Sequence, residues 1–163
     1  MSWRDIVAQH ELKISEVSIS ELEDAFRLDA EYYSPEHLEN DKKVERKGYK
    51  LLVVLTNKID VGFVGSMVSE YAEDGFPLLQ TQNVQELFLD TSDCKHINQE
   101  FHQKLKKSQI RKGDILIARS GSFGKASFYL EDEIVNSSDI IIVEATKKKI
   151  NPVYLVTFLN SLY

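Results

Sequence analysis

The residues best suited to chemistry lie in one short segment, Arg119-Ser120-Gly121-Ser122-Phe123-Gly124-Lys125. It joins two apolar, strand-like runs and holds two cations, two hydroxyls and two glycines. Glycines let a backbone approach a ligand closely, and cations with hydroxyls bind phosphates. The segment therefore predicts a nucleotide loop, a nucleic-acid-binding loop or a hairpin turn.

The spacing argues against a nucleotide-hydrolysing loop. A Walker A loop needs a glycine, four residues and then Gly-Lys-Ser/Thr. If Gly124 and Lys125 supplied the Gly-Lys, the first glycine would fall at Arg119 and the hydroxyl at Ala126. The Gly-x-Gly-x-x-Gly fingerprint of dinucleotide binding does not occur either. Gly121 and Gly124 could also simply give a hairpin its positive φ angles.

Other catalytic chemistry lacks its residue patterns. No histidine is paired in sequence with a serine or with Cys94, the single cysteine, and no His/Cys cluster has metal-ligand spacing. We expect no catalytic residue, no metal and no cofactor. The sequence indicates a binding module and not an enzyme.

Charge is distributed unevenly along the 163 residues, although the whole chain carries a net charge of −6. Residues 95–125 hold eight cations and two acids, a net charge of +6. Local potential binds a phosphate backbone, so this segment favours a polyanion partner, although it could also be a solvated cationic face. No apolar run approaches the ~20 residues that span a bilayer, and we expect a cytoplasmic protein without membrane contact.

Several polar side chains could contact nucleic acid. Arginine pairs with both acceptors of a guanine edge, amides address adenine, and lysine and serine hold phosphates. For the amides, turn capping is the competing interpretation. The candidate residues are Gln80, Gln82, Asn83, Arg119, Ser120, Ser122, Lys125, Ser137 and Ser138.

Periodicity and capping residues predict an α+β fold. It has N-terminal helices, a central mixed or antiparallel β-sheet with hairpin loops, and a C-terminal helix. Residues 51–55 fit either a strand or one turn of helix. We expect helices over 3–10, through 22–26, over 35–47 with Ser34 as its cap, after Asn98 and from Asn151-Pro152, and strands over 78–84, 115–118, 126–130, 134–135 and 140–144.

Four segments of the sequence together resemble a known family. One is Lys112–Ser122, which includes the start of the glycine-containing loop. The other three are Arg27-Leu28-Asp29-Ala30-Glu31-Tyr32-Tyr33, Gly75-Phe76-Pro77-Leu78-Leu79-Gln80-Thr81-Gln82-Asn83-Val84 and Asn151-Pro152-Val153-Tyr154-Leu155. From about residue 20 onward the chain is similar to a target recognition domain of the specificity subunit of type I restriction–modification systems. The Lys112-Gly113-Asp114-Ile115-Leu116 and Arg119-Ser120-Gly121-Ser122 blocks carry most of the resemblance.

The resemblance implies a non-catalytic subunit that binds double-stranded DNA. It directs partner modification and restriction subunits, and fused type IIG or IIB methyltransferase–nucleases carry similar domains. We expect one recognition domain over 1–150 and the start of a spacer helix over 151–163, cut short in a fragment. That helix could instead support a homodimer or a protein-docking role. Recognition loops around 62–69, 80–85, 119–125 and 136–139 would face the DNA.

Overall fold

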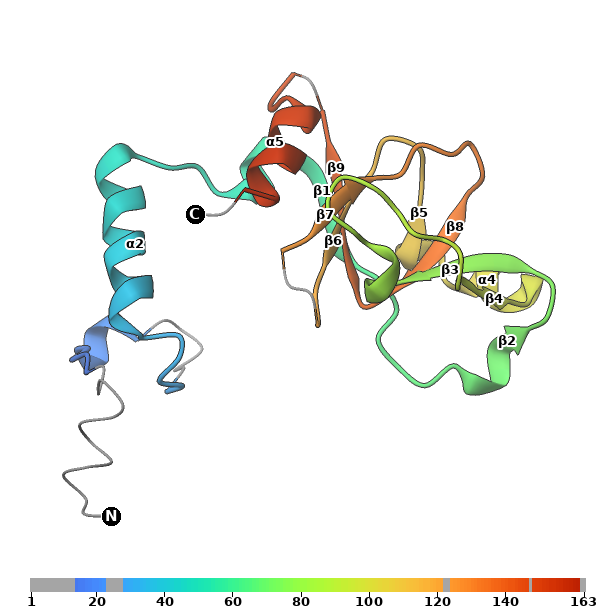
Figure 1. The fold of residues 1–163 in the computed structure, drawn as a ribbon, viewed down its shortest axis with the longest axis horizontal. Helices are drawn as coiled ribbons and strands as arrows, with labels where there is room; N and C mark the ends of the chain where they lie inside the picture. Colours follow the sequence, from blue (N-terminus) through green and yellow to red (C-terminus); the bar gives the residue numbers. More distant parts are fainter. Residues whose placement is uncertain (1–13, 23–27, 122–123, 147, 162–163) are drawn as a thin grey trace, which may run out of the picture. The chain divides into compact units, whose positions relative to one another are not determined.

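The computed structural model describes residues 14–22, 28–121, 124–146 and 148–161. The helix expected over 3–10, most of the one expected through 22–26, and the candidate residue Ser122 lie outside these ranges. The chain forms two compact units, Met1–Lys50 and Leu51–Tyr163 (Figure 1).

The first unit contains the 3₁₀ turn η1 (Ile19–Glu21) and the helix α2 (Pro35–Lys47). The α2 boundaries follow from local chemistry. The Ser34 hydroxyl accepts the backbone N–H of His37 at 3.4 Å, and Pro35 occupies the first turn, where its missing N–H costs nothing. Gly48 ends the helix at a φ of 76°. The predicted helix over 35–47 is confirmed.

The second unit contains nine strands and three α-helices among the described residues. Its elements are α3 (Leu52–Leu55), β1 (Thr56–Val61), η2 (Val68–Glu70), β2 (Tyr71–Ala72), β3 (Phe76–Gln80), η3 (Thr81–Asn83), β4 (Lys95–Ile97), α4 (Gln99–Lys104), η4 (Lys106–Ser108), β5 (Gln109–Ile110), β6 (Ile115–Ala118), β7 (Ala126–Phe128), β8 (Val135–Ser138), β9 (Ile140–Ala145) and α5 (Pro152–Leu159). The α+β class and the C-terminal helix are confirmed.

The strands form two sheets, where the sequence predicted one central sheet. A four-stranded antiparallel sheet has the order β1-β9-β6-β7, and a five-stranded mixed sheet has the order β2-β4-β3-β8-β5. In the mixed sheet, β3 and β8 are parallel neighbours. The glycine-containing loop is a hairpin, because β6 and β7 pair antiparallel and Ala118 donates its N–H to the Lys125 carbonyl at 2.8 Å.

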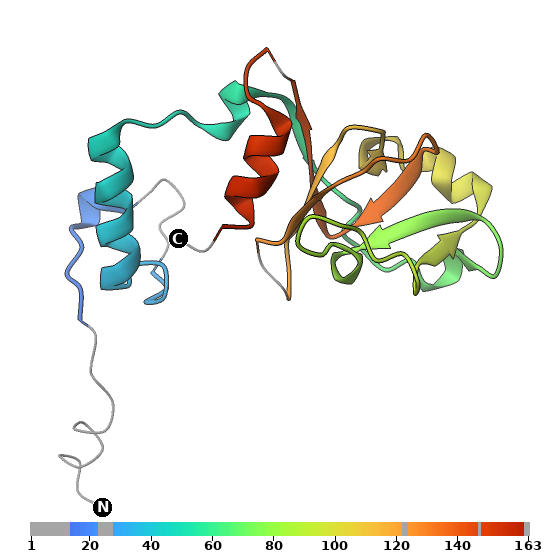
Figure 2. The same ribbon diagram turned by 45° about the horizontal axis from the view of Figure 1, so that its top comes forward.

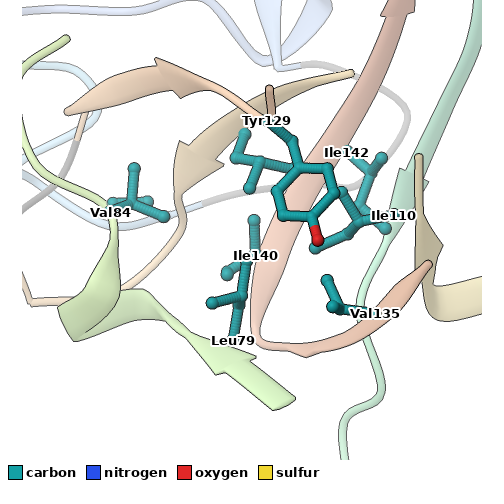
Figure 3. Packing of buried hydrophobic residues seen from close by; sticks show 9 residues of the cluster. Leu79, Val84, Ile110, Tyr129, Val135, Ile140 and Ile142 are labelled. Carbon is teal, nitrogen blue, oxygen red and sulfur yellow. The ribbon is translucent and has the colours of Figure 1, made fainter. Parts of the chain in front are cut away.

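The two sheets pack face to face around the largest buried cluster. Leu79, Ile110 and Val135 come from the five-stranded sheet, while Leu116, Ile140 and Ile142 come from the four-stranded sheet (Figure 3). Strand side chains alternate between faces, so Ile115 and Ile117 of β6 point to the opposite face. There they pack against Leu155 and Val156 of α5, which lies on this sheet (Figure 2).

The outer face of the five-stranded sheet is covered as well. Leu78 and Ile97 pack there with Met67, and Phe101 of α4 lies against them. The unit is therefore layered as α5, sheet, sheet and α4. Because β6 is covered on both faces, its apolar run is continuous and not alternating.

One side chain fastens α5 to the outer strand β7. The Asn160 amide donates to the Ala126 carbonyl at 2.8 Å, and its oxygen accepts the Ala126 N–H at 3.0 Å. The amide thus satisfies both backbone groups of an edge residue, as a neighbouring strand would.

Local features explain where other predicted elements differ. The strand expected over 78–84 ends at Gln80, because the Asn83 side chain accepts the Gln80 N–H at 2.8 Å and turns the chain into η3. Residues 52–55 form the helical turn, which resolves the open choice for 51–55. The strand β1 was not expected from the sequence, because most of its residues are polar. It forms a strand through its antiparallel pairing with β9.

Candidate functional site

Polar residues from distant segments meet where three strands end. The parallel β3 and β8 pair Gln80 with Ser138, so both strands end at the same place. In the other sheet, Ala118 at the end of β6 pairs with Ile140 at the start of β9. Residues following these strands must therefore lie together. We call this set, Thr81, Gln82, Arg119, Ser120, Ser138 and Asp139, the Asp139 edge.

Asp139 connects the Asp139 edge through its side chain. Its Oδ1 accepts the Arg119 Nη1 at 2.7 Å. Its Oδ2 accepts the Ser120 hydroxyl, which also lies 3.4 Å from the Thr81 hydroxyl. Both oxygens of one carboxylate are thus engaged by the glycine-containing hairpin.

The backbone of Asp139 is held independently. Its carbonyl accepts the Thr81 hydroxyl at 2.6 Å, and its N–H donates to the Phe63 carbonyl at 3.3 Å. The Ser138 hydroxyl donates to the same Phe63 carbonyl at 3.0 Å. The carboxylate that holds Arg119 is therefore itself fixed from two other segments.

Asp139 was not among the candidates from sequence. It stands between β8 of one sheet and β9 of the other, so the chain changes sheets in a single residue with a φ of 56°. Among non-glycine residues, aspartate and asparagine adopt this left-handed conformation most readily. An aspartate placed alone between two strand-forming runs was the available signal.

The structure brings several of the predicted residues together. Arg119, Ser120 and Ser138 belong to the Asp139 edge, and the Arg119 side chain is 45% exposed. Gln82 is exposed there, with its amide nitrogen 3.4 Å from the Gln80 side-chain oxygen. The Lys125 ammonium, at the other end of the hairpin loop, donates to the Gln85 side chain at 2.8 Å.

Two predicted residues are buried and serve the fold. Asn83 is 2% exposed, and its amide donates to the Asp90 carbonyl at 2.8 Å while its oxygen holds Gln80. Ser137 is fully buried, and its hydroxyl donates to the Ser108 carbonyl at 3.0 Å. Neither side chain reaches the surface, so turn and strand support accounts for both.

Three of the remaining cations of 95–125 gather elsewhere. Lys106, Arg111 and Lys112, together with Lys58 of β1, form what we call the basic edge, and they line a depression of about 360 Å³ with Asp114 and Glu144. Asp114 precedes β6 and Glu144 is near the end of β9, whereas Arg119 follows β6 and Asp139 precedes β9. The basic edge and the Asp139 edge therefore lie at opposite ends of the β6–β9 pair.

Acids, most of them from outside residues 95–125, pair with half of the cations of that segment. Lys104 pairs with Glu100 at 2.7 Å, Lys107 with Asp60 at 3.3 Å and Lys112 with Asp132 at 2.7 Å. With Arg119, four of the eight cations of this segment are in ion pairs. A hydrogen bond from Lys58 and a weaker one from Lys107 hold the pKa of Asp60 below its ordinary value of 3.8. The net charge of +6 is thus a property of the sequence window and not of one surface.

The described residues contain no group of three or more His, Cys, Asp or Glu side chains placed to hold a metal ion. Within the same residues, the helices are too short or too polar to cross a membrane. The chemistry available at the Asp139 edge is hydrogen bonding by one guanidinium, amides and hydroxyls.

Comparison with known proteins shows similarity to one class. The chain is 28% identical over 134 residues to the type I restriction enzyme EcoBI specificity subunit of Escherichia coli. The match covers 74% of this chain and 28% of that relative, so the chain spans little more than a quarter of its length. No family model matches the chain.

The fold is also shared with a solved structure. This is a chain described under the structural basis of complex assembly and conformational transition of the type I R-M system. The TM-score is 0.51 at 16% identity, over 76% of this chain and 32% of that one. The resemblance to a type I specificity subunit, first indicated by the sequence blocks, is confirmed.

Proposed function

We propose that this chain is a target recognition domain that binds double-stranded DNA sequence-specifically as part of a type I specificity subunit. The observation that carries the proposal is the 28% identity to the EcoBI specificity subunit across 134 residues. The shared fold and the polar Asp139 edge support it.

The Asp139 edge supplies groups suited to base edges. Arg119 keeps guanidinium N–H groups beyond the one bound to Asp139, and an arginine pairs with the O6 and N7 acceptors of guanine. The exposed amide of Gln82 suits adenine, and Lys125 suits phosphate oxygens. The Ser138 hydroxyl donates to the Phe63 carbonyl, so it retains its oxygen as an acceptor for a base amino group. The proposed contact set is Gln80, Gln82, Arg119, Ser120, Lys125 and Ser138, with Ser122 retained as a candidate outside the described residues.

In this proposal the chain has no catalytic step of its own. It directs modification and restriction subunits to DNA, with residues 1–150 as the recognition domain and 151–163 as the start of a spacer helix. A recognition domain of a fused type IIG or IIB enzyme would use the same binding chemistry. The role requires the compartment that holds the DNA, which we infer to be the cytoplasm.

Selection of bound duplexes from a random pool at moderate salt tests the proposal. The expected result is enrichment of a short motif, followed by tighter binding of that duplex than of a scrambled one. Specific sites are bound about 10³- to 10⁷-fold more tightly than non-specific DNA. Equal recovery of all sequences, with binding that disappears as salt rises, would reject the proposal.

A second candidate function is self-association through α5. Val153, Tyr154 and Phe158 are each more than half exposed on this helix, and the Tyr154 and Phe158 rings stack at 6.1 Å. Contiguous exposed apolar side chains are typical of interaction surfaces. Light scattering should then show a dimer that Tyr154→Glu converts to a monomer. A monomer at high concentration removes this candidate.

A further inference from the structure

We propose that Asp139 is a positioning residue for Arg119 and so determines specificity for one G·C base pair of the target. This inference rests on the proposed DNA-binding function. It concerns a residue that itself need not touch the DNA. Its basis is the way in which the two oxygens and the backbone of Asp139 are held.

The first step is the restriction of Arg119. An exposed arginine samples many rotamers, and ordering such a side chain on binding opposes association. Here the Asp139 carboxylate already holds Nη1 at 2.7 Å, while the Arg119 side chain remains 45% exposed. One N–H of the planar group is bound within the protein, and a guanidinium has further N–H donors for a ligand.

The second step is that Asp139 is rigid enough to fix another side chain. Its Oδ2 accepts the Ser120 hydroxyl, its carbonyl accepts the Thr81 hydroxyl at 2.6 Å, and its N–H donates to Phe63 at 3.3 Å. These bonds come from three different segments. A carboxylate on a freely moving loop could not set the direction of Arg119.

The third step concerns charge. A free arginine binds any phosphate, which adds affinity without sequence preference. The carboxylate neutralises Arg119 and repels the phosphate backbone, so phosphate contact gains less. A guanine edge still offers two acceptors in the plane of the guanidinium, whereas adenine presents a donor at the position of O6. The Arg119–Asp139 ion pair therefore favours guanine, because it weakens the contact of Arg119 with phosphate, which has no sequence preference.

Asp139→Asn is the variant that tests this role. It removes the charge, keeps the size of the side chain, and places asparagine at a φ of 56°, which asparagine tolerates well. Asp139→Gly is a second variant, because glycine adopts this φ freely and leaves no side chain. Thermal unfolding of each protein shows whether the fold is retained.

The chain offers a matched control. Lys112 and Asp132 form an ion pair of the same length, 2.7 Å, at the basic edge. Asp132→Asn raises the net charge as much as Asp139→Asn does. Any effect of total charge on DNA binding is therefore common to both variants. A difference between them must come from the place of the lost carboxylate, beside Arg119 or beside Lys112.

The experiment selects duplexes from a random pool with the native chain, Asp139→Asn, Asp139→Gly, Asp132→Asn, Arg119→Ala and the Arg119→Ala/Asp139→Asn double variant. One good bidentate contact discriminates about 5- to 150-fold against a wrong base. We expect Arg119→Ala to abolish this preference at one position. Asp139→Asn and Asp139→Gly should reduce the preference severalfold at that same position while binding scrambled DNA more tightly than the native chain. The double variant should match Arg119→Ala there.

The outcomes separate the inference from the proposed function. If Asp139→Asn and Asp139→Gly keep the native base preference while Arg119→Ala loses it, positioning by Asp139 is wrong and DNA recognition stands. The same conclusion follows if Asp139→Asn and Asp132→Asn change the preferences alike. If the native chain enriches no motif, the proposed function fails, and the inference fails with it.

Discussion

The two ends of the β6–β9 strand pair differ in how their polar groups are held. At the Asp139 edge, one carboxylate with a fixed backbone connects Arg119, Ser120 and Thr81. At the basic edge, Lys58 and Lys112 reach acids through exposed side chains, with 49% and 57% of their own side chains accessible. The first end is preorganised by a carboxylate with a fixed backbone, and the second consists of ion pairs between side chains.

Under the proposed function, this difference means that the number of cations does not locate the binding site. A preorganised donor loses little freedom when a ligand arrives, whereas a surface ion pair contributes only about 0–1 kcal/mol and is screened by salt. The cation-rich window 95–125 extends over both ends. Only the part that follows β6 combines charge with fixed geometry.

The largest expected effect comes from the core that both ends share. Leu116 is fully buried between the sheets on β6, the strand that connects the two edges. Leu116→Ala should lower the free energy of unfolding by about 2–5 kcal/mol through lost burial and the cavity left behind. Chemical denaturation measures this loss.

Leu130→Ala provides the control for that measurement. Leu130 is 65% exposed after β7, so its truncation should change stability by less than about 0.5 kcal/mol. Equal effects of the two substitutions would contradict the packing of β6 between the sheets.

The next largest effect, on DNA binding, compares the Asp139 edge with the basic edge directly. Arg119→Ala should weaken binding to the selected duplex by about 1–3 kcal/mol and relax one base position. Lys106→Ala, which removes a cation of the basic edge, should leave every base preference unchanged. Competition titrations with single-base variants of the duplex measure both. A loss of preference in Lys106→Ala would place base recognition at the basic edge.

A smaller effect distinguishes phosphate contact from base contact. Lys125→Ala should weaken all duplexes alike and reduce the slope of log affinity against log salt by about one unit. Lys112→Ala should leave the slope nearly unchanged, since the Lys112 ammonium is paired with Asp132 at 2.7 Å. Titrations at several salt concentrations give the slopes. Identical slopes in the native chain and Lys125→Ala would remove Lys125 from the contact set.

The smallest effect concerns acid stability near the basic edge. Because lysine hydrogen bonds hold the pKa of Asp60 below 3.8, its contribution to stability is present above that value and is lost as pH falls through the lowered pKa. Asp60→Asn should therefore cost about 0–1 kcal/mol at neutral pH, and the difference from the native chain should disappear in strong acid.

Denaturation across a pH series measures this difference, with Asp74→Asn in an exposed turn as the control. If the loss of unfolding free energy in Asp60→Asn grew as pH fell, the lysine contacts of Asp60 would not be the source of its contribution to stability.

Short-range signals explain what could be predicted from the sequence. Ser34, Asn98 and Asn151 each accept a backbone N–H at the start of a helix, and all three helix starts were expected. The apolar run of β6 likewise ended where predicted, at residue 118. Caps and apolar runs act over a few residues, so a sequence window contains the whole interaction.

The candidate site depends on strand pairings between segments that are far apart in the sequence, so no short stretch of sequence contains them. Asp139 meets Thr81 across 58 residues, and only the parallel β3–β8 pair brings them together. The interior positions of Asn83 and Ser137 depend on the packing of η3 and β8 in the same way. Polar residues at strand ends were found from sequence, but which of them face outward was decided by the tertiary fold.

The amide of Asn160 has a consequence for association between copies of the chain. β7 is an outer strand, and an outer strand with unpaired backbone groups acts as a template for intermolecular sheet growth. Asn160 occupies both backbone groups of Ala126, and Leu87 also donates to that carbonyl at 3.0 Å. At the start of β7, the hairpin that carries Arg119 therefore offers no unpaired backbone group of Ala126 to another chain, while Gly121 and Gly124 of its loop are exposed.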